Sequence, residues 1–245
     1  MNEMLTPQPT LQRITPDTLD AILAEVAQQK ITSLALIGPD VDVDIRGQYR
    51  AVKRLNFYPR VYQLSVPVSN LGEKLKRLSY LSSLLLWGIS LEVTGVKHLA
   101  NLVNLTTLDL MESRIGDEGA KHLANLVNLT ELNLYGNEIG DEGAKHLANL
   151  VNLTTLDLGM SKIGDEGAKY LTNLVNLTTL DLAWNQIGAE GAKQLANLVN
   201  LTTLDLESNQ IGAEGAKQLA NLVNLTTLGL ELNGIGAEGA STLQI

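Results

Sequence analysis

The amino-acid sequence predicts an α/β solenoid, a curved horseshoe with a parallel sheet on its concave face and helices on its convex face. The main observation is a stretch of the form LTTLDLxxNxIGxEGAKxLANLVN that recurs every 24 residues. Self-similarity at a fixed period is typical of strand-helix units that stack only on their neighbours. We call each unit a rung. Close copies begin at Leu105, Leu129, Leu153, Leu177, Leu201 and Leu225, and a looser copy begins at Leu81.

The first part of each rung has the pattern of a short strand. In the first close copy, Leu108 and Leu110 alternate with Thr107, Asp109 and Met111, which is a period of two. Because successive side chains of a strand point to opposite faces, the leucines are expected in the core and the other three on the concave face.

The second part of each rung has the pattern of a helix. Ile115 is the next apolar anchor, and residues 116–119 (GDEG) then turn the chain into a helix whose N-terminus favours their carboxylates. Ala120, Leu123 and Ala124 form an apolar stripe at i, i+3 and i+4. Because helices are wider than the roughly 4.8 Å between strands, the stack must curve with its strands inside.

The residues upstream of Leu81 follow this pattern less closely. Residues 31–36 (ITSLAL) and 61–66 (VYQLSV) match the strand part, and helical connections are expected at 48–55 and 70–78. The sequence therefore predicts three regions: an N-terminal capping helix region at 1–30, degenerate leading repeats at 31–80 and regular repeats at 81–245.

A capping helix is expected at the start because a terminal rung cannot leave its inner leucines in water. Thr15 is a good N-cap and Pro16 suits the first helical position. An apolar stripe follows at Leu19, Ile22, Leu23 and Val26.

Composition and charge limit the classes of function. Residues 1–80 carry 10 basic and 8 acidic side chains, a balance of +2, whereas residues 81–245 carry 8 and 19, a balance of −11. Binding of nucleic-acid phosphates requires Lys and Arg, so the acidic repeats are not expected to bind nucleic acid. A partner with a basic surface is expected instead. The chain has no cysteine, no apolar run of transmembrane length and no secretory signal pattern. These absences favour an intracellular location.

The rung resembles the ribonuclease-inhibitor-like leucine-rich repeat. Its IGxEGAKxLA portion is similar to the GALA-type repeats of bacterial pathogens, and its LANLVNLTTLDL portion is similar to internalin repeats. The resemblance implies a leucine-rich-repeat solenoid that acts as a curved interaction module, and it implies a bacterial virulence effector that meets a host protein. The location expected from it is the bacterial cytoplasm, or the host cytosol for a translocated effector. The chain departs from GALA-type proteins in showing no F-box, and from bacterial leucine-rich-repeat ubiquitin ligases in having no cysteine.

The candidate partner-binding residues lie in concave columns that vary from rung to rung. Trp and Tyr are the types most enriched at binding hot spots, although some could lie flat against neighbouring side chains. The aspartates could recognise a basic surface or be solvated residues copied with the rung. The apolar candidates are Trp87, Met111, Tyr135, Met160 and Trp184, and the acidic ones are Asp109, Asp157, Asp181, Asp205, Glu207 and Glu231.

Other repeated residues are better explained by architecture. His98, His122 and His146 share a column on successive helices, about 8–10 Å apart, too far for three imidazoles to share one metal. The Asn column at Asn137, Asn185, Asn209 and Asn233 should bond backbone groups, with Ser113 and Ser161 doing part of that work. The six NLT tripeptides fit the glycosylation pattern but recur with the rung.

No cofactor, metal or enzymatic activity is expected. The chain shows no nucleophile elbow, phosphate-binding loop or dinucleotide glycine motif. Two alternatives stay open: a self-assembling scaffold stacked through the last rung, which stops at STLQI, and a small enzyme within residues 1–80. The segment GQYRAVKRLNFYPR (47–60), with Arg46 before it, interleaves basic and aromatic residues, which suits a solvated helix face better than RNA or an anionic membrane.

Overall fold

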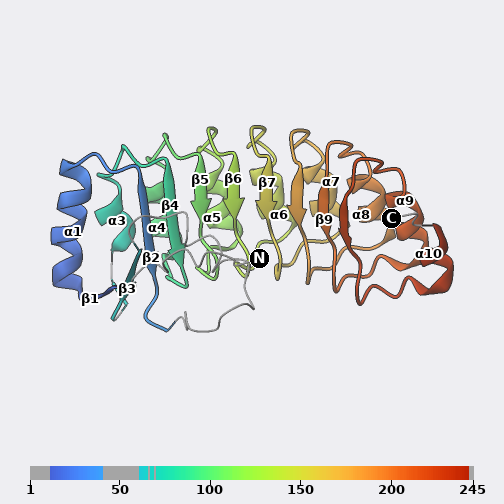
Figure 1. Cartoon of the computed structure of the whole chain (residues 1–245), viewed down its shortest axis with the longest axis horizontal. Coiled ribbons are helices and arrows are strands. Elements are labelled where there is room, and N and C mark those ends of the chain that lie inside the picture. The colour runs from blue at the N-terminus through green and yellow to red at the C-terminus, as the bar shows by residue number, and fades with distance from the viewer. Residues whose placement is uncertain (1–11, 41–60, 66, 69, 243–245) are drawn as a thin grey trace, which may run out of the picture.

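The computed structural model describes residues 12–40, 61–65, 67–68 and 70–242, and within them ten parallel strands form one sheet with helices along one face (Figure 1). The strands are β1 (Gln12–Ile14), β2 (Ser33–Ile37), β3 (Val61–Leu64), β4 (Ser83–Trp87), β5 (Thr107–Asp109), β6 (Glu131–Asn133), β7 (Thr155–Asp157), β8 (Thr179–Asp181), β9 (Thr203–Asp205) and β10 (Thr227–Gly229). The helices are α1 (Pro16–Gln28), α3 (Leu71–Leu75), α4 (Glu92–Leu99), α5 (Gly116–Leu123), α6 (Asp141–Leu147), α7 (Asp165–Leu171), α8 (Ala189–Leu195), α9 (Gly212–Leu219) and α10 (Gly236–Thr242). The predicted solenoid is confirmed.

The rungs stack with a register of one repeat. Leu108 of β5 lies beside Leu132 of β6, which lies beside Leu156 of β7. All three side chains are fully buried, and they belong to one apolar cluster that runs from Ile14 to Leu222. Each leucine therefore packs on its own copy in the next rung, so one repeated residue builds the whole core.

The strands of the leading region are present, but their order is not that of a simple solenoid. The sheet order is β1-β3-β2-β4, so β3 lies between β1 and β2 although it follows both in sequence. Leu34 pairs with Leu84 of β4, and Leu36 pairs with Tyr62 of β3. Residues 34–37 of β2 are all buried, which is typical of a central strand covered on both faces.

The helix predicted after Thr15 is present as α1. The Thr15 side chain accepts a hydrogen bond from the Thr18 backbone N–H, and the Thr18 hydroxyl accepts one from the Thr15 N–H. These reciprocal bonds form a capping box. Leu19, Leu23 and Val26 are buried against the core, whereas Ile22 is partly buried. The division of the chain at residues 30 and 80 stays a prediction.

The asparagine column bonds adjoining rungs as predicted. The Asn185 side chain accepts from the Ile163 N–H at 2.9 Å and donates to the Leu158 carbonyl at 2.9 Å. Equivalent bonds are made by Asn137, Asn209 and Asn233. The Ser113 hydroxyl donates to the Leu86 carbonyl, but the prediction for Ser161 is wrong, because its buried hydroxyl has no hydrogen-bond partner. A serine side chain is too short to reach both partners of an asparagine.

The aspartates at the helix starts act on the following rung, not only on their own as expected. The Asp117 carboxylate accepts from the Gly140 and Gly143 N–H groups at 2.7 and 3.0 Å, at the start of α6. The same pair of bonds joins Asp141 to α7 and Asp165 to α8. The carboxylate therefore caps the next helix and links two rungs.

This cap decides the backbone conformation of the glycine that it contacts. Gly140, Gly164 and Gly188, each capped by an aspartate of the previous rung, have φ between −106° and −99°. In three other rungs the equivalent glycine has φ near +60°. In the rung before each of these glycines, the position of the capping aspartate is occupied by Val93, Ala189 or Ala213, which cannot accept a hydrogen bond through the side chain. The three glycines are Gly116, Gly212 and Gly236.

The remaining expectations concern turns, membranes and the undescribed segments. The Asn128 side chain of one NLT tripeptide donates to the Val103 carbonyl at 2.9 Å, and the other five asparagines make equivalent bonds to the previous rung. Among the described helices, none has the length and apolar character needed to cross a membrane. The helix expected at 48–55 and the basic segment 46–60 lie outside the described residues.

Candidate binding surface on the concave face

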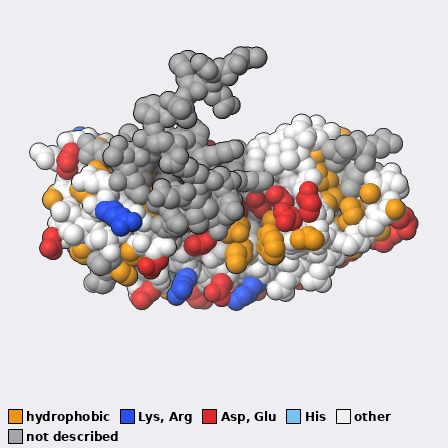
Figure 2. Space-filling model, turned by 60° about the horizontal axis from the view of Figure 1, so that its bottom comes forward, with side chains coloured by type: hydrophobic (Ala, Val, Ile, Leu, Met, Phe, Trp, Pro, Cys, Tyr) orange, Lys and Arg blue, Asp and Glu red, His pale blue; other side chains and the backbone are white. Residues whose placement is uncertain are grey.

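Four columns of side chains form the concave face of strands β5–β10, namely the positions equivalent to Thr107, Asp109, Met111 and Glu112. Every charged residue in these columns is acidic, and none is Lys or Arg. The acidic residues are Asp109, Glu112, Glu131, Asp157, Asp181, Asp205, Glu207 and Glu231. Figure 2 shows acidic and hydrophobic side chains next to one another over the middle of the array. The face therefore combines negative charge with apolar area.

The aspartate column has a structural role that the sequence left open. The Asp109 carboxylate accepts from the Met111 N–H at 3.1 Å and from the Asn133 side chain at 2.9 Å. The other three aspartates accept from the N–H two residues on in the same way. Asp109 and Asp181 are buried, so at these two rungs the aspartate is neither a solvated residue nor an exposed charge for a basic partner, the two interpretations that the sequence left open. Asp157 and Asp205 are half-buried.

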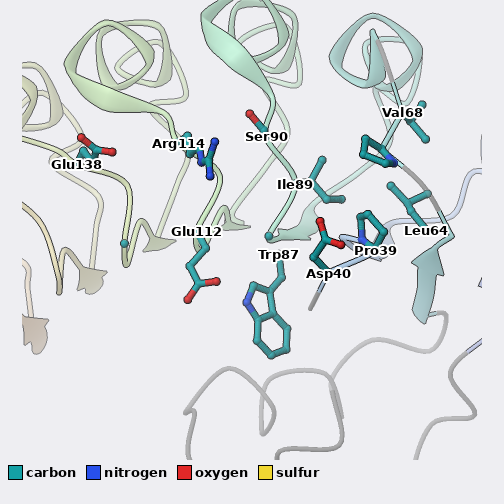
Figure 3. Close-up of a pocket in the computed structure, with 13 residues that line it drawn as sticks. Pro39, Asp40, Leu64, Val68, Trp87, Ile89, Ser90, Glu112, Arg114 and Glu138 are labelled. Atoms are coloured by element: carbon teal, nitrogen blue, oxygen red, sulfur yellow. The ribbon is translucent and has the colours of Figure 1, made fainter. Parts of the chain in front are cut away.

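The first residues of the next column lie below the surface. Trp87 retains 3% of its exposure, and Met111, one rung on, is equally buried. Figure 3 shows Trp87 beside Pro39 and Asp40, which follow β2, in a pocket whose lining includes Leu64 of β3. The expectation that Trp87 and Met111 contact a partner from the concave face is therefore wrong, because both side chains are buried. Pro67 and Val68, which follow β3, line the pocket of Trp87 as well.

The Tyr135 side chain lies against its neighbours, which is one of the two arrangements that the sequence allowed for the aromatic residues of the concave face. Its side chain is half-buried, and a Cβ added at Gly159 would lie only 2.8 Å from its Cδ2 atom. The ring thus lies across the neighbouring rung, in space that any larger residue would fill. Further along the column, Glu207 is half-buried and Glu231 is exposed.

The column at Glu112, which we call the rim, has a backbone conformation that the sequence did not reveal. All seven of its residues have positive φ, between 50° and 68°: Gly88, Glu112, Gly136, Met160, Trp184, Ser208 and Leu232. This left-handed region suits glycine and is uncommon for other residues. Met160 is 57% exposed and Trp184 is 54% exposed, as expected for partner-binding residues.

Leu232 is a rim residue that sequence reasoning did not select. It is 73% exposed and has φ of +57°. A signal was present in the sequence, since Gly88 and Gly136 occupy the same column and indicate a position that favours glycine. A bulky apolar residue there is unexpected on grounds of folding alone.

The other polar clusters have local partners. His98 lies 3.1 Å from Glu73, a residue of α3. Among the described residues, no group of three or more His, Cys, Asp or Glu side chains is placed to hold a metal ion. A hydrogen bond from Lys162 at 2.7 Å holds the pKa of Glu138 below its usual value. Lys162 and Glu138 are thus paired beside the rim.

Comparison with known proteins agrees with the fold. A family profile described as "Leucine Rich repeat" matches residues 101–124, 125–148, 149–171, 173–196, 197–220 and 221–243. The crystal structure of internalin C2 from Listeria monocytogenes is 34% identical with a TM-score of 0.58, over 69% of this chain and 70% of that one. An internalin F structure from the same organism is 24% identical with a TM-score of 0.46, over 69% and 54%. No curated protein matches. With six matched repeats that cover more than half of its length, the chain belongs to the leucine-rich repeat family.

Proposed function

We propose that this chain is a protein-interaction module whose concave face, from β6 to β10, receives a partner with a basic surface. The observation that carries the proposal is the pairing of exposed Met160 and Trp184 with columns whose only charges are acidic. Opposite charge steers a basic partner to the face, and apolar anchors supply affinity. The proposed charged contacts are Asp157, Asp205, Glu207 and Glu231, with Tyr135 as a further apolar contact.

The scaffold suits such a role because its backbone is held by bonds between rungs. A specific complex needs about 800 Å² from each partner, and a row of five rungs offers a long surface for that contact. Trp87, Met111, Asp109 and Asp181 are buried, so they support the surface from below and take no direct part in the proposal.

We extend the proposal to a bacterial effector that binds a host protein and has no enzymatic activity of its own. Its support is the likeness to an internalin structure from Listeria monocytogenes and the resemblance of IGxEGAKxLA to GALA-type repeats. In this proposal the protein works in the bacterial cytoplasm or, after translocation, in host cytosol.

The test is quantitative affinity capture with the wild type and a Met160→Gly/Trp184→Gly variant. Glycine suits the rim conformation, so the variant should keep its fold. The matched control is Val127→Ser/Val151→Ser, which removes two equally exposed apolar side chains from another edge of the rungs. Basic proteins retained by the wild type and the control, but lost by the rim variant, would support the proposal. Identical capture by all three proteins would contradict it.

One observation favours a second candidate, self-association through the last rung. Leu225, Leu228 and Leu230 are only partly buried, whereas their equivalents one rung earlier are fully buried. Leu228 and Leu230 border an open pocket with Leu232 and Ile235. Sedimentation velocity over a hundredfold range of concentration tests this candidate. A strictly monomeric protein, or a dimer that a Leu228→Asp substitution leaves intact, would contradict it.

A further inference from the structure

The rim residues Met160, Trp184 and Leu232 are poorly explained by folding. Their φ angles of 50°, 59° and 57° lie in the left-handed region, which L-residues adopt at an energetic cost. Glycine avoids that cost and occupies the same column at Gly88 and Gly136. More than half of each of the three side chains is exposed, so little burial offsets the strain. Strain that folding does not require points to a functional contact.

The spacing of the three side chains defines the geometry of that contact. Trp184 is one rung after Met160, and Leu232 is two rungs after Trp184. Neighbouring strands lie about 4.8 Å apart, so the apolar positions fall at about 0, 5 and 14 Å along the array. Ser208 occupies the rung between the last two and leaves a gap at about 10 Å.

A helix that lies across the rungs matches this spacing better than an extended segment does. Residues i, i+3 and i+10 of an α-helix share a face and rise by about 0, 4.5 and 15 Å. Side chains on one face of a strand recur every 6.7 Å or so, at about 0, 7 and 13 Å. A polyproline helix repeats a face every 9 Å or so. The first interval, from Met160 to Trp184, separates these cases most clearly.

The charges on the two sides of the rim orient the bound segment. On the strand side stand the half-buried carboxylates of Asp157, Asp205 and Glu207. On the outer side the exposed residues are Gln186 and Gln210, which are uncharged, and Lys162 and Glu138, which form an ion pair with no net charge. Basic residues of a partner are therefore favoured on one flank only, the flank that faces the strands.

We propose that the rim receives an amphipathic helix of the partner. The helix places apolar residues at i, i+3 or i+4, and i+10 or i+11 over Met160, Trp184 and Leu232. Its Lys or Arg residues lie on the flank toward the strands. This inference rests on the proposed function, since it names the kind of segment that the concave face binds.

Selection from a displayed library of random 16-residue peptides tests the inference. The full-length wild-type protein is the bait, and the Met160→Gly/Trp184→Gly variant is used for counter-selection. Enriched peptides are synthesised, their affinities are measured by fluorescence anisotropy, and their helicity on binding is followed by circular dichroism. The Val127→Ser/Val151→Ser variant serves as the control for general loss of apolar surface.

The expected result is enrichment of the helical apolar pattern with one basic flank, a gain of helicity on binding and at least tenfold weaker binding by the rim variant. Peptides with strict i, i+2 apolar alternation that bind without helicity would overturn the helix while leaving the concave-face function intact. Absence of any peptide that distinguishes the wild type from the rim variant would overturn the helix proposal and count against the function as well. Peptides that the control variant also loses would overturn the assignment to the rim.

Discussion

Strain at Trp184 has a consequence for stability that can be measured without a partner. Replacing Trp184 by Ala or by Gly removes the same side-chain contacts, but only Gly relieves the φ angle of +59°. A left-handed conformation costs an L-residue about 1–2 kcal/mol, and the extra backbone freedom of Gly in the unfolded chain costs about 0.5–1 kcal/mol. The difference predicts that the Gly variant is more stable than the Ala variant by about 0.5–1 kcal/mol.

The assay is equilibrium urea unfolding of both variants followed by circular dichroism at 222 nm. Thermal melts of the same two variants give a second measurement. A protein of this size gains about 2–4 °C in Tm per kcal/mol, so the two melting temperatures should differ by about 1–4 °C. The matched control is the same pair of substitutions at Gln186, an exposed residue outside the positive-φ positions. There the order should reverse, with Ala more stable than Gly.

An Ala variant at position 184 that is as stable as the Gly variant, or more stable, would refute the reasoning. The rim would then carry no strain, and the φ angles of Met160, Trp184 and Leu232 would give no reason to expect a functional contact there. Equal differences at positions 184 and 186 would refute it too, because only position 184 has a positive φ angle.

Three further predictions concern the scaffold, and urea unfolding checks each of them. Asp141→Ala removes both hydrogen bonds to the start of α7 and should lower the free energy of unfolding by about 1 kcal/mol; no change would show that water replaces the cap. Asn185→Ala leaves buried backbone groups unpaired and should cost about 2 kcal/mol or more, whereas Ser161→Ala, at a hydroxyl without a partner, should be nearly neutral; a reversed order would contradict the bonding described. Leu156→Ala, in the fully buried core, should cost about 2–5 kcal/mol and more than Leu228→Ala in the last rung; equal costs would mean that the last rung is as well covered as the others.

The repetitive part of the fold follows from the sequence because one rung and its period define it. Leu108 packs on Leu132 for the same reason that Leu132 packs on Leu156, so a single amphipathic strand and helix predict the entire core. The role of Asn185 follows from the sequence for the same reason, since a buried amide that recurs after most strands can be satisfied only by backbone groups of its own and adjoining rungs.

The remaining features depend on contacts that no single rung contains. Asp117 stands at the start of its own helix, and only stacking shows that its carboxylate reaches Gly140 in the next rung. The position of β3 between β1 and β2 carries no repeat signal. Trp87 shares a column with the half-buried Tyr135 and the exposed Glu231. Alternation along a strand predicts the direction of a side chain, but it does not predict which residues cover that side chain. Pro39 and Asp40 after β2, and Pro67 and Val68 after β3, line the same pocket as Trp87, and none of them belongs to the regular repeat.

The rim also shows where to look for function in a chain built from copied units. Variation between copies is a weak signal by itself, since Tyr135 varies and yet lies against Gly159. A residue that is unsuited to its local backbone conformation is a stronger signal, because neither the repeat pattern nor the stability of the fold explains why that residue is present. Gly88 and Gly136 show that this chain can place glycine at the rim. Met160 and Trp184 combine such a conformation with exposure on an acidic face, and for this reason the proposals rest on them and not on the buried Trp87.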